Sequence, residues 1–223
     1  MPLIYINAPI GSGKTELANL LGERLGEDVY LENVGDMPML TKFYEAGEES
    51  RRELSFKLQI AFLNYRYAQL RKGLYQAHVY GKQNSVYDSS LLSDGLMVEN
   101  LYQRGEFSSE ERDLYLELSQ NMQANVSGFP FSGKPSLVVF INTSFETMLS
   151  RIQHRGREME TTDPELLDYY KGVWNVYQNW YKGNSELQVL SIDGDKYDYV
   201  NSESDREIVL TQITDRLHEL GNL

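Results

Sequence analysis

The clearest chemical signal is a short string near the N-terminus, Ala8-Pro9-Ile10-Gly11-Ser12-Gly13-Lys14-Thr15. Its two glycines let the backbone curl so that successive N–H groups point at phosphate oxygens. Lys14 can reach the terminal phosphates of a nucleotide, and the Thr15 hydroxyl can complete the ligand shell of Mg²⁺. The string therefore fits a phosphate-binding P-loop, with alanine in the first glycine position.

The flanking sequence supports the same interpretation. An apolar run, Leu3–Ile6, precedes the string and predicts a strand, and the amphipathic segment 14–25 predicts a helix whose positive N-terminal dipole faces the loop. The alternative is a glycine-rich turn that caps an ordinary helix. The strand and helix context favours phosphate binding over that alternative.

Two acidic residues end predicted strands. Glu32 closes the run Val29–Glu32, and Asp88 closes the run Ser85–Asp88. Ligands bind at the carboxyl ends of parallel strands. Glu32 could accept the proton of an attacking hydroxyl, or serve as a helix cap or solvated charge. Asp88 could hold Mg²⁺ directly or through water.

A third group lies on the predicted helix 52–77. Gln59 and Arg66 are seven residues apart, so they share one helix face within about 20°. The Gln amide and the Arg fork both suit the edge of a nucleobase, and Asp94 could pair with Arg66 and fix its direction. Alternatively, these charges are unrelated surface groups. Two apolar neighbours could flank a planar base or simply belong to the core: Leu58 and Phe62.

Three arginines gather after the predicted helix 145–154: Arg151, Arg155 and Arg157. Guanidinium groups match phosphate oxygens and neutralise the charge that spreads over a transferring phosphoryl group. The alternative is a basic helix C-terminus favoured by the helix dipole. A turn of a different kind, Asp193-Gly194-Asp195-Lys196, follows the last predicted strand, and its acids are typical turn formers.

Strands and helices alternate along the chain. The predicted strands are Leu3–Ile6, Val29–Glu32, Ser85–Asp88, Leu137–Asn142 and Leu187–Ile192; the predicted helices are 14–25, 37–45, 52–77, 90–104, 109–125, 145–154, 164–181 and 204–220. Nearly all-apolar strands between helices predict an α/β fold with a five-stranded parallel sheet covered on both faces. No linker separates two domains, so we expect one domain over residues 1–223.

The overall composition excludes several classes of function. The chain has 33 acidic and 21 basic residues, a net charge of −12, which argues against a nucleic-acid or anionic-membrane partner. No apolar run approaches the ~20 residues of a membrane span. The absence of cysteine excludes disulfides and thiolate chemistry and fits the reducing cytoplasm.

Five strings, in order, resemble the deoxyribonucleoside kinases, particularly the bacterial deoxyadenosine/deoxyguanosine kinases. They are Ile6–Thr15, Tyr30-Leu31-Glu32-Asn33-Val34, Phe56–Arg66, Thr147–Arg157 and Ile192–Val200. The resemblance covers nearly the whole chain. It implies a P-loop kinase fold and ATP-dependent phosphorylation of a deoxyribonucleoside at its 5′-hydroxyl. It also implies a dimer, of identical or related subunits.

The resemblance also implies residue roles. Glu32 would be the general base, and Gln59, Arg66 and Asp94 would read a purine or deoxycytidine base rather than thymidine. Residues 151–163 would form a lid over the ATP phosphates, and the Asp193–Lys196 loop would contact adenine mainly through its backbone. Two residues would bind the sugar 3′-hydroxyl: Tyr44 and Glu160.

The chain departs from the family pattern at Ser89. Asp88-Ser89-Ser90 matches the family's Asp-Arg-Ser motif without its arginine, which helps to hold the reacting hydroxyl and phosphate; Lys14 and the lid arginines could substitute. A catalytically weakened nucleotide-binding subunit is therefore one alternative. A nucleoside monophosphate kinase or other small-molecule kinase is another, with extra arginines available for an acceptor phosphate: Arg51, Arg52 and Arg66. The base preference and the effect of Ser89 stay open.

Overall fold

Five strands make one sheet, in the spatial order β2-β3-β1-β4-β5, with every neighbouring pair parallel. The computed structural model describes residues 3–32, 38–45, 48–81, 85–126, 134–157, 160 and 166–223. The strands are β1 (Leu3–Asn7), β2 (Asp28–Tyr30), β3 (Ser85–Tyr87), β4 (Leu137–Asn142) and β5 (Val189–Asp193). The predicted five-stranded parallel sheet is confirmed.

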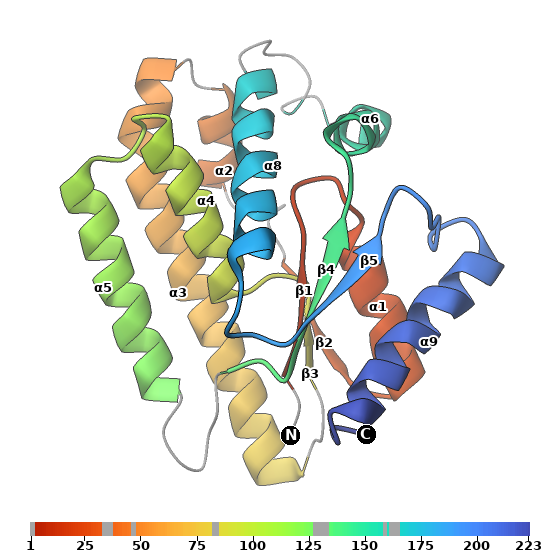
Figure 1. The fold of residues 1–223 in the computed structure, drawn as a ribbon. Coiled ribbons are helices and arrows are strands. Elements are labelled where there is room, and N and C mark those ends of the chain that lie inside the picture. The colour runs from red at the N-terminus through yellow and green to blue at the C-terminus, as the bar shows by residue number, and fades with distance from the viewer. Residues whose placement is uncertain are drawn as a thin grey trace.

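Helices cover both faces of the sheet because both faces are apolar. In β1, Leu3 and Tyr5 belong to one buried cluster while Ile4 and Ile6 belong to the other. Helices α1 (Lys14–Leu25) and α9 (Glu203–Glu219) pack on the Ile4 side (Figure 1). The other side carries α2 (Pro38–Glu45), α3 (Glu48–Tyr80), α4 (Leu91–Gln103), α5 (Ser109–Val126) and α8 (Leu166–Gly183).

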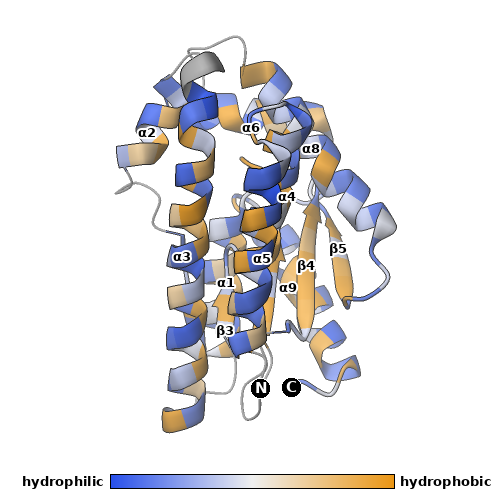
Figure 2. Cartoon of the chain, turned by 90° about the vertical axis from the view of Figure 1, so that its left-hand side faces the viewer, coloured by the Kyte–Doolittle hydropathy of each residue, from blue (hydrophilic) through white to orange (hydrophobic). Residues whose placement is uncertain are grey.

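The remaining helix, α6 (Phe145–Arg155), lies at the carboxyl end of the sheet, just beyond β4 (Figure 1). Figure 2 shows hydrophobic strands inside and helices whose polar residues face outward. None of the helices in the described ranges is long and apolar enough to cross a membrane.

Parallel register brings the carboxyl ends of the strands to one edge. Tyr5 of β1 pairs with Tyr87 of β3, and Tyr30 of β2 pairs with the same Tyr87. The residues that follow these strands therefore meet above the sheet. Those residues include the P-loop after β1, Glu32 after β2 and Asp88 after β3.

The element boundaries differ from the predictions by a few residues. The largest difference is at α3, which begins at Glu48 rather than at residue 52. Arg51 precedes the predicted helix 52–77 and was a candidate for binding an acceptor phosphate, but it lies on α3 with only 1 % of its surface exposed. Strands β2 and β3 end before Glu32 and Asp88. Part of the predicted lid (158–159 and 161–163), Asn33 and Val34 lie outside the described residues.

Candidate active site

The P-loop connects the end of β1 to the first residue of α1, as predicted. Gly11 has φ +77° and Gly13 has φ +87°, a left-handed conformation that favours glycine. A Cβ atom on Gly13 would lie 2.6 Å from the hydroxyl oxygen of Tyr199. Only glycine fits this position, because any other side chain would be both strained and in collision.

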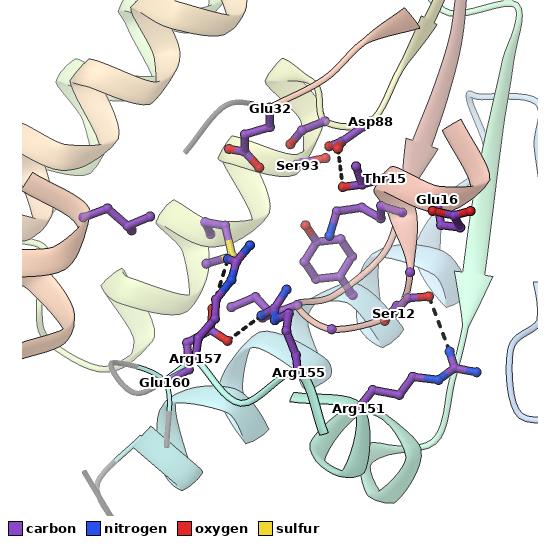
Figure 3. Close-up of a pocket in the computed structure, with 18 of the residues that line it drawn as sticks. Ser12, Thr15, Glu16, Glu32, Asp88, Ser93, Arg151, Arg155, Arg157 and Glu160 are labelled. Carbon is purple, nitrogen blue, oxygen red and sulfur yellow. Dashed lines mark hydrogen bonds and ion pairs between the residues drawn. The ribbon is translucent and has the colours of Figure 1, made fainter. Parts of the chain in front are cut away.

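Two side chains from later in the chain hold the carbonyl groups of the P-loop. The Tyr199 hydroxyl donates to the carbonyl oxygen of Ser12 at 2.9 Å and to that of Gly13 at 3.3 Å. Arg151 of α6 donates to the Ser12 carbonyl at 3.4 Å (Figure 3) and to the Gly194 carbonyl at 2.8 Å. Arg151 was predicted to bind the nucleotide; its guanidinium here braces the loop that faces the nucleotide.

The Lys14 ammonium group lies within the P-loop, where it donates to the carbonyl oxygens of Ala8 at 3.0 Å and Pro9 at 3.1 Å. Burial lowers the pKa of Lys14, and the nearby carboxylates of Asp88 and Glu32 offset part of that effect. A phosphate in the loop would supply a stronger partner than these neutral carbonyls.

Thr15 and Asp88 lie side by side, and the Thr15 hydroxyl donates to Asp88 Oδ2 at 2.5 Å (Figure 3). Asp88 is 2 % exposed. Burial raises its pKa, whereas the Thr15 hydrogen bond and the Lys14 charge lower it. The pair places two oxygen ligands beside the P-loop, which is the chemistry a Mg²⁺ ion requires.

A cavity of about 590 Å³ opens next to the P-loop and extends toward α3 and α4. It contains most of the predicted site residues. Those that line it are Gly11, Ser12, Gly13, Lys14, Thr15, Glu32, Tyr44, Leu58, Gln59, Phe62, Arg66, Asp88, Asp94, Arg151, Arg155, Arg157 and Glu160. Residues that are up to 149 positions apart in the sequence thus share one cavity, from Gly11 to Glu160.

Arg66 makes several polar contacts in the deep part of this cavity. Its Nη1 lies 3.0 Å from Asp94 Oδ1, its Nη2 donates to Glu32, and its guanidinium stacks 5.0 Å above the Phe62 ring. The predicted Arg66–Asp94 pair is therefore present. Burial raises the pKa of Asp94 to about 7, although the Arg66 charge lowers it.

Two acceptor atoms in this region have no hydrogen-bond partner among the described residues. They are Gln59 Oε1 and Asp94 Oδ2, both fully buried in side chains that line the cavity. An unmatched buried acceptor costs about 1–3 kcal/mol. A ligand with N–H groups on one edge would recover that free energy.

The lid region centres on Glu160. Arg155 donates to one carboxylate oxygen of Glu160 at 2.6 Å, and Arg157 donates to the other at 3.5 Å (Figure 3). The Tyr170 hydroxyl donates to the Glu160 carbonyl at 2.9 Å. Tyr44, the other predicted sugar-binding residue, lines the same cavity as Glu160, and burial raises its pKa.

The acidic side chains of the turn after β5 act as turn formers, as predicted. Asp193 Oδ1 accepts from the backbone N–H groups of Asp195 and Lys196, both at 3.1 Å. The Asp195 carboxylate accepts from Ser144 N, at the start of α6, at 3.0 Å. Neither carboxylate lines the cavity, because both are taken up by backbone N–H groups. The following residues, Asp198–Asn201, line it instead.

The P-loop follows the first strand of a parallel sheet, and the cavity beside it also contains the Glu32 carboxylate and the polar pocket around Arg66 and Asp94. This combination defines a P-loop phosphotransferase. The family comparison gives the particular family: the deoxynucleoside kinase profile matches residues 4–218. The chain belongs to the deoxynucleoside kinase family and is a kinase.

Two relatives and one solved structure illustrate the similarity. A deoxyguanosine kinase of Lactobacillus acidophilus is 40 % identical over 100 % of this chain and 94 % of its own length. A deoxyadenosine kinase of the same species is 34 % identical over 99 % of both chains. The structure of deoxyadenosine kinase from M. mycoides with bound dCTP matches with a TM-score of 0.76 at 20 % identity, over 96 % of this chain and 99 % of the other. That last match concerns the fold.

Proposed function

We propose that this chain transfers the γ-phosphate of ATP to the 5′-hydroxyl of a purine deoxyribonucleoside in nucleotide salvage. The observation that carries the proposal is one continuous cavity with the P-loop at one end and the Arg66–Asp94 pair at the other. Glu32 lies between them: it accepts from Arg66, and its charge acts on Lys14. The similarity to deoxyguanosine and deoxyadenosine kinases supports the purine preference.

The reaction needs one base and several cations. Glu32 accepts the proton of the 5′-hydroxyl while that oxygen attacks the γ-phosphorus in line. The new P–O bond forms as the bond to the β-phosphate oxygen breaks, and ADP leaves. Lys14, Arg155 and Arg157 stabilise the negative charge on the transferring group. Arg151 holds the Ser12 carbonyl so that the P-loop keeps its shape.

The base pocket supports a base that offers amino or ring N–H donors. Gln59 Oε1 and Asp94 Oδ2 are free acceptors, and the Arg66 fork is the donor beside them. Leu58 and Phe62 supply apolar walls. Adenine and guanine both offer such an edge, as does cytosine, so deoxycytidine is a third acceptor to measure. Tyr44 and Glu160 would bind the sugar 3′-hydroxyl.

The donor set fits a Mg²⁺ ion. Thr15 and Asp88 offer two oxygens at 2.5 Å from each other, and Mg²⁺ characteristically takes one or two protein oxygens and completes its octahedron with water and phosphate. No group of three His, Asp or Glu side chains that could hold a metal comes together in the described part of the chain. When bound, Mg²⁺ would neutralise charge on the β- and γ-phosphates.

The wider assembly follows from the family resemblance. We expect a single kinase domain over residues 1–223 with a lid at about 151–163, in a homodimer or a dimer with a related subunit, in the cytoplasm. The charge of −12 argues against nucleic-acid and membrane partners. Light scattering of the purified protein, alone and with a related kinase chain, measures the assembly.

The test is an acceptor panel with Mg·ATP. Deoxyadenosine, deoxyguanosine, deoxycytidine and thymidine are compared, with deoxyadenosine and deoxyguanosine monophosphates as acceptors for the alternative monophosphate kinase. We expect monophosphate from the purine nucleosides and little from thymidine. Failure of every nucleoside, or preference for a monophosphate, would overturn the proposal. Glu32→Gln is the matched control, because it keeps the shape of the side chain and removes the base.

A further inference from the structure

The guanidinium of Arg66 contacts four side chains, three of them from outside its own helix α3. Asp94 of α4 pairs with Nη1, Glu32 accepts from Nη2, and Phe62 lies against its face. The fourth partner is Ser89, whose hydroxyl oxygen accepts from Nε at 3.1 Å and from Nη2 at 2.8 Å. The side chain of Arg66 is only 7 % exposed.

Ser89 decides which way this arginine points. Nη2 bridges the Ser89 hydroxyl and the Glu32 carboxylate, so the hydroxyl fixes the nitrogen that holds Glu32. Ser89 is 6 % exposed, and within the described part of the chain no other arginine contacts it. Lys14 and the lid arginines were expected to compensate for the missing motif arginine; in this structure Lys14 donates to P-loop carbonyls and Arg155 donates to Glu160.

We propose that Ser89 and Arg66 are positioning residues for Glu32, so that one arginine serves both the base pocket and the general base. The inference rests on the proposed function, because it needs Glu32 to be the base. It explains how the chain activates the hydroxyl with serine at position 89. The weakened-subunit alternative then loses its support, since the charge that the motif arginine would supply comes from α3.

The charge balance supports this arrangement. Before transfer, one guanidinium contacts two carboxylates, those of Glu32 and Asp94. When Glu32 takes the proton of the 5′-hydroxyl, Arg66 and Asp94 remain as a neutral pair. No charge is left buried without a partner at either stage, which avoids the desolvation cost of an isolated ion.

The test is Ser89→Ala in the full-length enzyme, with kcat and KM measured for the best nucleoside of the panel. Losing a hydrogen bond to a charged group should lower kcat about tenfold with little change in the KM of ATP. Ser89→Thr keeps the hydroxyl and should restore most of the rate. Ser119→Ala is the matched control, because Ser119 is a similarly buried serine of α5 outside the cavity.

Repeating the Ser89→Ala substitution in the Glu32→Gln variant separates the positioning of Glu32 from an effect on nucleobase binding. In Glu32→Gln, which has no base to position, Ser89→Ala should cause no further loss of kcat. If Ser89→Ala raised the nucleoside KM and left kcat unchanged, the inference would be overturned, because Arg66 would then serve base binding alone. An equal loss of kcat in the wild-type and Glu32→Gln backgrounds would overturn it as well. A wild-type enzyme that phosphorylates no nucleoside would instead overturn the proposed function, and the inference with it.

Discussion

The contact between Gly13 and Tyr199 can be tested by a double-mutant cycle. In Gly13→Ala, the new Cβ meets the Tyr199 hydroxyl oxygen at 2.6 Å, whereas the next ring atoms lie at 3.4 and 3.6 Å. The hydroxyl must therefore move and lose its bonds to the Ser12 and Gly13 carbonyls. In Tyr199→Phe the same hydroxyl is absent, and the added Cβ has only ordinary neighbours.

The magnitudes follow from these two effects. A left-handed φ of +87° costs a non-glycine residue about 1–2 kcal/mol. The two lost hydrogen bonds cost about 1–2 kcal/mol together. We expect Gly13→Ala to lower the free energy of unfolding by about 2–4 kcal/mol, and Tyr199→Phe by about 1–2 kcal/mol. The double variant should lose about 1–2 kcal/mol less than the sum, because the bonds are lost only once.

Urea unfolding of the four proteins, followed by circular dichroism without nucleotide, measures the cycle. Titration with Mg·ATP provides a second readout, and both single variants should bind more weakly because the P-loop carbonyls are no longer held. Additive losses, within about 0.5 kcal/mol, would refute the reasoning, since they would mean that the Gly13 Cβ never meets Tyr199.

Three further predictions concern the cavity. Glu32→Gln should lower kcat by about 10²–10⁴-fold without weakening ATP binding, measured by product formation and by equilibrium titration; an unchanged kcat would exclude Glu32 as the base. Because burial raises the pKa of Asp94 to about 7, the folded protein keeps a proton that the unfolded chain releases near pH 4. The stability from this proton is complete below pH 4 and is lost as pH rises through 7, by about 4 kcal/mol. Urea unfolding from pH 4 to 8 should show that decline in the wild type and not in Asp94→Asn; parallel curves would contradict it. Glu160→Gln removes the charge that Arg155 contacts at 2.6 Å, and should raise the nucleoside KM about tenfold while the nucleoside without a 3′-hydroxyl is affected little; equal effects on both would exclude a role at the sugar.

Local features of this fold could be predicted because they are set by neighbours in the sequence. The P-loop string predicted both the loop and the 14–25 helix, and α1 spans Lys14–Leu25. The i, i+7 spacing of Gln59 and Arg66 predicted a shared face, and both line the cavity. The Arg66–Asp94 pair joins two helices, and its signal in the sequence was the opposite charge of the two side chains together with the family resemblance.

The remaining features depend on contacts between distant segments. Tyr199 reaches the P-loop across 187 residues, and nothing near it in the sequence indicates that its hydroxyl faces Ser12. Arg66 Nη2 donates to both Glu32 and Ser89. In the sequence, Ser89 is notable only because it replaces the arginine of the Asp-Arg-Ser motif. Arg51 is a charged residue in a polar stretch of the sequence, yet it is buried because α3 begins three residues earlier, at Glu48.

Helix α6 joins two parts of the site that otherwise belong to different segments. Arg151 donates a hydrogen bond to the Ser12 carbonyl, and Arg155, one helical turn later, donates to the Glu160 carboxylate. At the N-terminal end of the helix, the Asp195 carboxylate accepts from the Ser144 N–H group. Because Arg151 and Arg155 lie one turn apart on the same helix, α6 links the position of the Ser12 carbonyl to that of the Glu160 carboxylate.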